Sequence, residues 1–153
     1  MQYLLLLFVI LTTAKVQGVS EIDSCYSTED ITVPYTIWIG TNIQESHTTH
    51  VTVKRFTPFY GVMEAAGEND PGNFGFEATC SQYGHYITSI GGHSEDKSTS
   101  IFWLFFALES PPKPLNPPSS QYLSPAGVDG IHVVNDTIHY LFWLRNITDF
   151  FGQ

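Results

Sequence analysis

Residues 62–106 read VMEAAGENDPGNFGFEATCSQYGHYITSIGGHSEDKSTSIFWLFF and contain the most informative succession of elements in the chain. Its first residues continue a helical pattern, which the turn formers at 69–72 end. Two strands are then predicted, over residues 74–81 and 86–90, followed by a polar loop. Residues 101–108, IFWLFFAL, show no polar alternation, so we expect a central strand that is covered on both faces.

The residues before this stretch predict a β-hairpin and a short helix. Residues 31–43 and 50–56 alternate β-branched or aromatic residues with polar ones, and a polar turn at 44–48 joins them. Pro58 is suited to open a helix, which we expect to end near Glu68. The apolar residues of this helix recur at the spacing of one helical face: Phe59, Val62, Met63 and Ala66.

After the aromatic strand predicted at residues 101–108, the chain has an irregular segment before its last strands. Residues 110–126 contain six prolines, which preclude a regular ladder and predict a stiff loop: Pro111, Pro112, Pro114, Pro117, Pro118 and Pro125. The last strands are predicted at 131–134 and 137–143, and residues 146–153 are expected to form a C-terminal tail. The order of elements fits an α+β domain over residues 31–145, a β-grasp-like mixed sheet with one short helix packed on one face.

The N-terminus predicts export from the cell. The apolar run at residues 3–11 is too short to span a bilayer, and small residues precede a cleavage site after Gly18. Residues 1–18 are therefore interpreted as a signal peptide and residues 19–30 as a polar N-terminal tail. An N-terminal membrane anchor is the alternative.

An oxidising, extracellular compartment would affect four further side chains. Cys25 and Cys80 are the two cysteines of the chain, so a disulfide between them is the default expectation. Asn135 and Asn146 lie in Asn-x-Thr glycosylation motifs. We therefore expect a secreted, disulfide-bonded glycoprotein.

Charge and motifs narrow the function. The formal net charge of −9 repels nucleic acid and anionic membrane surfaces, so neither is an expected partner. We also expect no membrane span. Hydrolase, metalloprotease and phosphate-loop motifs are not found, which predicts that the chain is not an enzyme and uses no catalytic cofactor. The pairs His47 with His50 and His132 with His139 lack a third ligand, so no metal site is predicted.

Short pieces of sequence occur in a characteristic order along residues 31–143. They are ITV at 31–33, YTI at 35–37, VMEAA at 62–66, FEAT at 76–79, YG at 83–84, SI at 89–90, Trp103, and GV at 127–128. In this order they resemble the C-terminal β domain of the cobalamin carriers intrinsic factor and transcobalamin, the transcobalamin-like C-terminal domain. Members of that family bind cobalamin between this domain and a helical domain.

The resemblance implies a cobalamin site made of two segments. The implied ligand-binding residues are Gln82, Tyr83, Gly84, His85, Tyr86 and Ile87 in one segment, and Trp103, Leu104, Phe105, Phe106 and Ala107 in the other. Aromatic and aliphatic side chains can cover the apolar corrin disc, while strand-end backbone groups meet its rim of amides. Gly84 lets the main chain approach closely because it has no Cβ.

Two of these assignments have competing interpretations. His85 could approach the cobalt or a corrin amide, but a surface or edge-strand histidine is the interpretation we favour. Trp103, Phe105 and Phe106 could form a platform for the ligand or belong to the core.

The chain also departs from the family. The family's helical domain has no counterpart in the sequence, and the loop at 110–125 is longer than the family's corresponding loop. A separate helical-domain protein or a cell-surface receptor is therefore an expected partner. We expect a secreted cobalamin- or corrinoid-binding domain for extracellular capture or transport. The alternative is a secreted protein-interaction module of the same fold that has lost the ligand.

Overall fold

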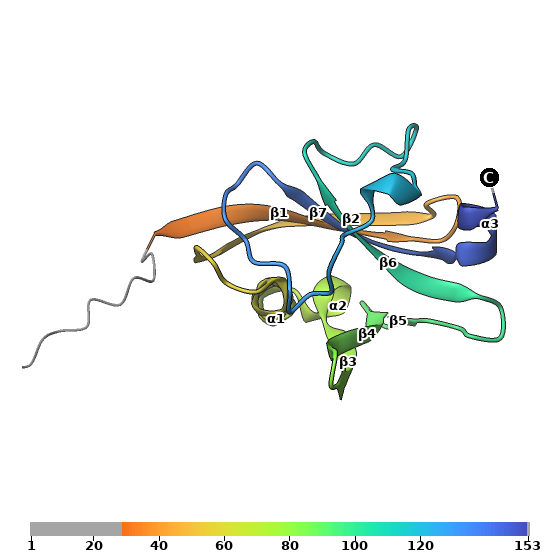
Figure 1. Cartoon of the computed structure of the whole chain (residues 1–153), viewed down its shortest axis with the longest axis horizontal. Helices are drawn as coiled ribbons and strands as arrows, with labels where there is room; N and C mark the ends of the chain where they lie inside the picture. The colour runs from red at the N-terminus through yellow and green to blue at the C-terminus, as the bar shows by residue number, and fades with distance from the viewer. Residues whose placement is uncertain (1–28, 153) are drawn as a thin grey trace, which may run out of the picture.

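The structure, a computed structural model, describes residues 29–152 and contains seven strands in two sheets (Figure 1). The larger sheet has the order β2-β1-β7-β6. Its strands are β1 (Asp30–Ile39), β2 (Glu45–Lys54), β6 (Ile101–Leu108) and β7 (His139–Asn146). Strands β1 and β7 run parallel, whereas the other neighbours are antiparallel. The predicted α+β fold with a mixed sheet is therefore confirmed.

The second sheet and the helices surround the first. The smaller sheet, in the order β3-β4-β5, contains β3 (Phe76–Ser81), β4 (Gly84–Ile90) and β5 (His93–Ser94). The helices are α1 (Phe59–Asn69), α2 (Pro71–Phe74), α3 (Ile147–Phe151) and the 3₁₀ turn η1 (Ser120–Tyr122). In Figure 1, α1, α2 and the smaller sheet lie on one side of the larger sheet, and the proline-rich loop with η1 lies on the other.

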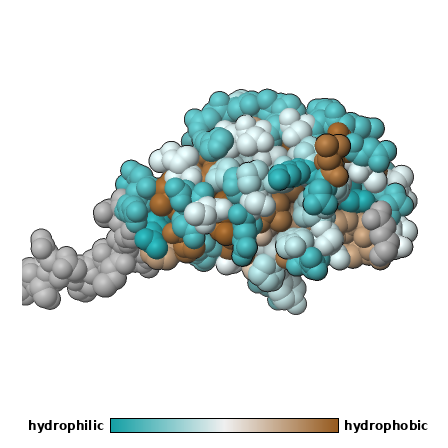
Figure 2. All heavy atoms as spheres, turned by 90° about the horizontal axis from the view of Figure 1, so that it is seen from above, coloured by the Kyte–Doolittle hydropathy of each residue, from teal (hydrophilic) through white to brown (hydrophobic). Residues whose placement is uncertain are grey.

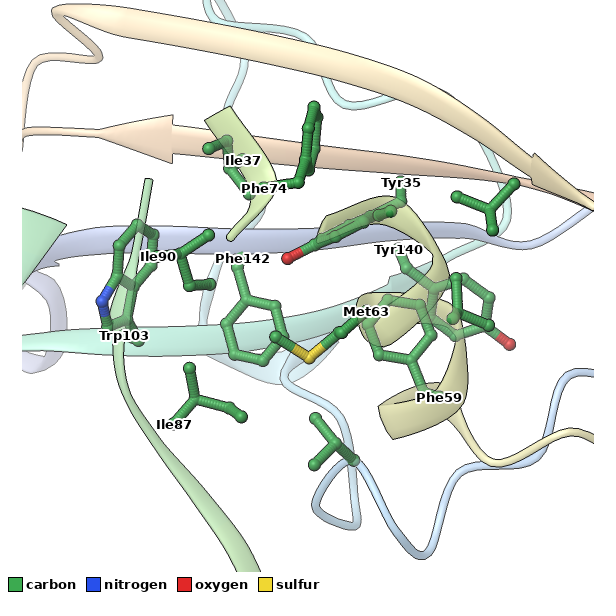
Figure 3. Packing of buried hydrophobic residues seen from close by; sticks show 14 of the residues in the cluster. Tyr35, Ile37, Phe59, Met63, Phe74, Ile87, Ile90, Trp103, Tyr140 and Phe142 are labelled. Carbon is green, nitrogen blue, oxygen red and sulfur yellow. The ribbon is translucent and has the colours of Figure 1, made fainter. Parts of the chain in front are cut away.

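Helix α1 packs its apolar face against the larger sheet, as the residue spacing predicted. All four residues of that face are buried: Phe59, Val62, Met63 and Ala66. The Phe59 ring meets Tyr35 edge-on at 5.3 Å between centroids, and its centroid lies 4.5 Å from that of Tyr140. Figure 3 labels these three side chains within the core. Tyr35 is fully buried, and burial raises the pKa of its hydroxyl, which therefore stays protonated.

A second core covers the opposite face of the larger sheet. Its buried members are Trp38, Phe106, Leu108, Leu141, Trp143 and Phe150. Trp38 and Trp143 meet edge-to-face at 5.4 Å, and the Arg145 guanidinium lies 4.1 Å above the Trp143 ring. The high aromatic content of the chain is thus largely used in covering both faces of one sheet.

The first hairpin turns earlier than the sequence indicated. Strand β1 ends at Ile39, and the turn spans residues 40–44, where Gly40 (φ 89°) and Ile43 (φ 50°) leave the extended conformation. The predicted turn at 44–48 is misplaced because residues 45–48 already belong to β2, and Gln44 alone of these residues lies in the turn. Strand β2 is an edge strand with mostly exposed or half-buried side chains, so its polarity resembles that of a turn.

The prediction that residues 101–108 form a central strand is also wrong. Strand β6 lies at the edge of the larger sheet, and β1 and β7 are central. Its two faces are nevertheless covered, one by the α1 core and the other by the second core. The proline-rich loop protects part of its free edge, because Ser124 donates a backbone hydrogen bond to Phe105 (2.8 Å).

Other helix and strand boundaries in the structure differ from the predicted ones for local reasons. Residues 71–74 form α2, capped by the Asp70 side chain, so β3 begins at Phe76 rather than at residue 74. Residues 131–134 form an isolated bridge and backbone hydrogen bonds with residues 56–59 rather than a strand, and β7 starts at His139. The expected C-terminal tail contains α3, which buries Phe150.

Several predictions concern residues outside the described range. The signal peptide, nearly all of the 19–30 tail and Cys25 lie there, so the disulfide stays a prediction; Cys80 is exposed on β3. Between residues 29 and 152, no helix has the length and apolar character needed to cross a bilayer.

The two glycosylation motifs differ in their surroundings. Asn135 is exposed in a loop, and its Oδ1 accepts hydrogen bonds from Thr137. Asn146 is half-buried: its Oδ1 caps α3 by accepting from the Thr148 and Asp149 amides, and its Nδ2 donates to Thr99 O at 2.8 Å. Asn135 is therefore the more accessible acceptor.

Candidate functional site

The first predicted segment forms the tip of the β3–β4 hairpin. Gln82 and Tyr83 make the turn, and Ser81 pairs with Gly84. The Ser81 hydroxyl accepts from the Tyr83 amide at 3.1 Å and donates to Gly84 O at 3.2 Å. Gly84 has φ +98°, a conformation that favours glycine. The tip therefore projects Tyr83, which is 89% exposed, into solvent.

His85 is fixed by a carboxylate and an aromatic ring. Its amide donates to Asp129 Oδ2 at 2.6 Å, and its Nδ1 lies 2.8 Å from Asp129 Oδ1. The imidazole stacks on Tyr60 of α1, with ring centroids 4.0 Å apart and planes at 19°. A Cβ on Gly84 would collide with Asp129 Oδ2, so Gly84 makes room for this contact.

The chemistry of the pair determines the tautomer of His85. The hydrogen bonds that Asp129 accepts, first from the His85 amide and then from its ring, lower the pKa of the Asp129 carboxyl. An ionised carboxylate can only accept, so His85 Nδ1 carries the proton and donates. In the neutral imidazole, Nε2 then holds a lone pair. No hydrogen-bond partner of Nε2 is found within residues 29–152, and the side chain is 32% exposed.

The other residues of the first segment alternate between the two faces of β4. Tyr86 points outward, and its hydroxyl donates to Glu95 Oε2. Burial, followed by this hydrogen bond and the Glu95 charge, raises the pKa of Tyr86 to about 12. Ile87 is only 5% exposed and packs in the α1 core. Ligand contact by this segment is thus restricted to residues 82–86.

The second predicted segment is packed within the protein. Trp103 is 8% exposed, and its indole N–H donates to His93 O at 3.2 Å. The Phe105 ring stacks on Phe59 at 4.9 Å and on Phe142 at 4.7 Å. Phe106 is fully buried in the second core. Of the remaining residues, Leu104 and Ala107 are half-buried.

The two segments meet inside the molecule rather than around an open surface. Ile87 of β4 and Trp103 of β6 belong to the same core, as Figure 3 shows. The exposed rings of the first segment are Tyr83 at the hairpin tip and Tyr86 on β4, whereas the half-buried Leu104 packs on the opposite face of the larger sheet. The aromatic strand β6 supports the smaller sheet, and Tyr83 is the most exposed ring of the two segments.

A hollow of about 730 Å³ lies elsewhere, between the end of β6 and the proline-rich loop. Its lining residues are Ala107, Leu108, Glu109, Ser110, Pro111, Pro112, Lys113, Asn116, Pro117, Pro118, Ser119, Gln121, Tyr122 and Leu123. Ala107 is the one predicted site residue among them. Figure 2 looks onto the side that carries this loop, where the surface is largely hydrophilic with smaller hydrophobic groups between.

The sequence interpretation missed Tyr60 and Asp129. Asp129 lies 44 residues from His85, and its own neighbourhood shows only a glycine-containing turn directly after the GV piece at 127–128. Tyr60 lies next to the predicted buried face of α1, so the helical pattern gave it no role. Neither residue carries a local signal for contact with the hairpin.

Comparison with known proteins found a relative that is similar in sequence and a solved structure with a similar fold. No family model matches the chain. Uncharacterized protein CG3556 of Drosophila melanogaster is 35% identical over 119 residues, which cover 78% of this chain and 20% of that protein. The chain thus spans about a fifth of the length of the curated relative it matches.

The structural comparison supports the predicted resemblance at the level of the fold. The crystal structure of haptocorrin in complex with Cbi (cobinamide) matches with a TM-score of 0.59 and 23% identity, over 75% of this chain and 25% of that chain. Three quarters of this chain therefore share their fold with a quarter of the haptocorrin chain.

Proposed function

We propose that the chain is a secreted corrinoid-binding domain, which captures or carries its ligand outside the cell and performs no chemistry on it. The observation that carries this proposal is the similarity of its fold to haptocorrin, whose crystal structure contains cobinamide. The similarity extends over three quarters of this chain, so it includes most of the described domain.

The hairpin tip supplies the surface on which a corrinoid would lie. A corrin is a broad disc, and Tyr83 offers an almost wholly exposed ring to its face. Gly84 has no side chain to hold the disc away from the backbone. The polar groups of Gln82 and the strand ends are suited to the amides at the corrin rim. Trp103, Phe105 and Phe106 act indirectly, because they hold the strands in place.

A partner would complete the site. One hairpin covers one face of a disc, so the second face would be covered by a separate helical-domain protein or a cell-surface receptor. Export by a signal peptide, the Cys25–Cys80 disulfide and a glycan on Asn135 belong to the same proposal. A disulfide at Cys80 would tie the N-terminal segment to the strand that precedes the hairpin tip.

Equilibrium dialysis with dicyanocobinamide tests the function. We expect micromolar protein to retain the corrinoid, and we expect Tyr83→Ala to weaken retention. Tyr122→Ala is the matched control, because Tyr122 is also exposed (51%) but lies on the proline-rich loop. No retention by the wild-type chain, or equal retention by both folded variants, would contradict the proposal.

The protein-interaction module remains the second candidate because of the proline-rich loop. Leu115 in that loop is fully exposed, and the loop lines the hollow beside β6. Proline-rich segments commonly serve as recognition motifs for other proteins, and Leu115 would supply an apolar contact within this one. Failure of the wild-type chain to retain any corrinoid would favour this function.

A further inference from the structure

Coordination of a cobalt ion in a corrin requires few protein ligands. The macrocycle supplies four equatorial nitrogens, so one protein donor at an axial position completes a bond to the metal. A bare metal ion needs three or four protein ligands, and within residues 29–152 no group of three His, Cys, Asp or Glu side chains could hold one. One suitably oriented histidine is therefore sufficient to coordinate the cobalt of a corrinoid.

His85 has the features of such a histidine. Metal-binding histidines commonly donate their second ring N–H to a carboxylate, which fixes the ring and makes the free nitrogen more basic. Asp129 is this carboxylate for His85: its Oδ1 accepts from Nδ1 at 2.8 Å, and its Oδ2 accepts from the His85 backbone amide at 2.6 Å. Stacking on Tyr60 restricts rotation of the ring. Nε2 is therefore the ring nitrogen whose lone pair is available to bind a metal.

Other histidines with acidic neighbours are arranged differently. His47 and His93 both direct Nε2 toward Glu45 Oε2, at 3.6 and 3.9 Å. Their Nε2 atoms therefore face a carboxylate instead of being left available. His85 also lies next to Gly84 and within two residues of the exposed Tyr83, in the part of the hairpin to which the corrin contact is assigned.

From this geometry we propose that His85 binds the cobalt of a corrinoid through Nε2, with Asp129 as the residue that positions it. This inference rests on the proposed corrinoid-binding function. In the step, the Nε2 lone pair displaces an axial water from Co(III). A Co–N bond forms, a Co–O bond breaks, the water leaves, and no electron is transferred to or from the protein.

Two forms of cobinamide separate coordination from simple binding. Aquacobinamide has axial positions that exchange water, whereas dicyanocobinamide has both positions occupied by cyanide. We expect the visible absorption of aquacobinamide to shift when the full chain binds it. In His85→Ala the shift should disappear, and affinity for aquacobinamide should fall by a larger factor than affinity for dicyanocobinamide. Asp129→Ala should weaken aquacobinamide binding by about 10- to 100-fold, as loss of such a carboxylate partner does at other metal sites.

A spectroscopic signature excludes a purely structural role for His85. Cob(II)inamide has no nitrogen base of its own, so ¹⁴N splitting of its electron paramagnetic resonance lines on binding must come from a protein nitrogen. We expect this splitting in the wild-type chain and its loss in His85→Ala, with folding of each variant checked by circular dichroism.

The outcomes distinguish the two proposals. If the wild-type chain retains dicyanocobinamide but shows neither the absorption shift nor the nitrogen splitting, the cobalt ligand is overturned while corrinoid binding stands. Splitting that persists in His85→Ala overturns the assignment to this residue. If the wild-type chain retains no corrinoid, both proposals fail.

Discussion

Replacement of Gly84 by alanine tests how the hairpin tip is built. Alanine at φ +98° is strained, which costs about 1–2 kcal/mol. The new Cβ would also collide with Asp129 Oδ2 and displace the carboxylate from His85. A hydrogen bond to a charged group contributes about 1.5–3 kcal/mol, and we take the lower end because the Asp129 side chain is 39% exposed. The free energy of unfolding should therefore fall by about 3 kcal/mol.

Gly92→Ala is the matched control for this prediction. Gly92 also has a positive φ, +78°, but a Cβ there would meet nothing within 4 Å, so only the strain of about 1–2 kcal/mol is expected. Urea denaturation followed by circular dichroism measures both variants. In an Asp129→Ala background, Gly84→Ala should cost no more than Gly92→Ala, because the contact is already gone. Equal costs of the two glycine replacements in the wild-type background would show that the contact with Asp129 does not contribute to stability.

Three further predictions concern the packing and the termini of the elements. Asn146→Ala removes the cap of α3 and should lower the free energy of unfolding by about 1 kcal/mol. Thr148→Ala is the control, because it abolishes the same glycosylation motif but keeps the cap. Equal melting temperatures of these two variants would contradict the prediction. Phe59→Ala should cost about 3–5 kcal/mol in urea denaturation, because it empties a fully buried site; a cost near zero would contradict the packing. Tyr86 should ionise near pH 12, because its pKa is raised by burial and by Glu95. The stability that this raised pKa contributes is complete below pH 10 and is lost as the pH rises through 12. An absorbance titration of the wild-type chain against Tyr86→Phe measures the ionisation, and a midpoint near pH 10 would contradict the prediction.

The sequence was sufficient for elements whose burial follows a regular period. Phe59, Val62, Met63 and Ala66 recur on one face of α1, and the structure buries all of them. The uniform apolarity of β6 correctly indicated that both of its faces are covered. It did not reveal the strand's place at the edge of the sheet, because covering by a loop and by another strand leave the same pattern in sequence.

The candidate site was predictable only in part because its contacts are long-range. Tyr83 and Gly84 lie in the interval between the strands predicted at 74–81 and 86–90, since strand boundaries and turns are local properties. Trp103 and Phe106 could have belonged to a platform or a core, and only tertiary packing places them in the core. The contact between His85 and Asp129 joins residues that are far apart in the chain, and no periodicity connects them.

Amide mapping by nuclear magnetic resonance locates the surface on which a corrinoid binds. Cyanocobalamin is diamagnetic, so its addition to the ¹⁵N-labelled chain reports contact through changes in chemical shift. We expect the largest changes at residues 82–86 and at Asp129, with small changes around the hollow beside the proline-rich loop. Unchanged hairpin amides at saturating ligand, or changes confined to residues 109–123, would contradict this expectation.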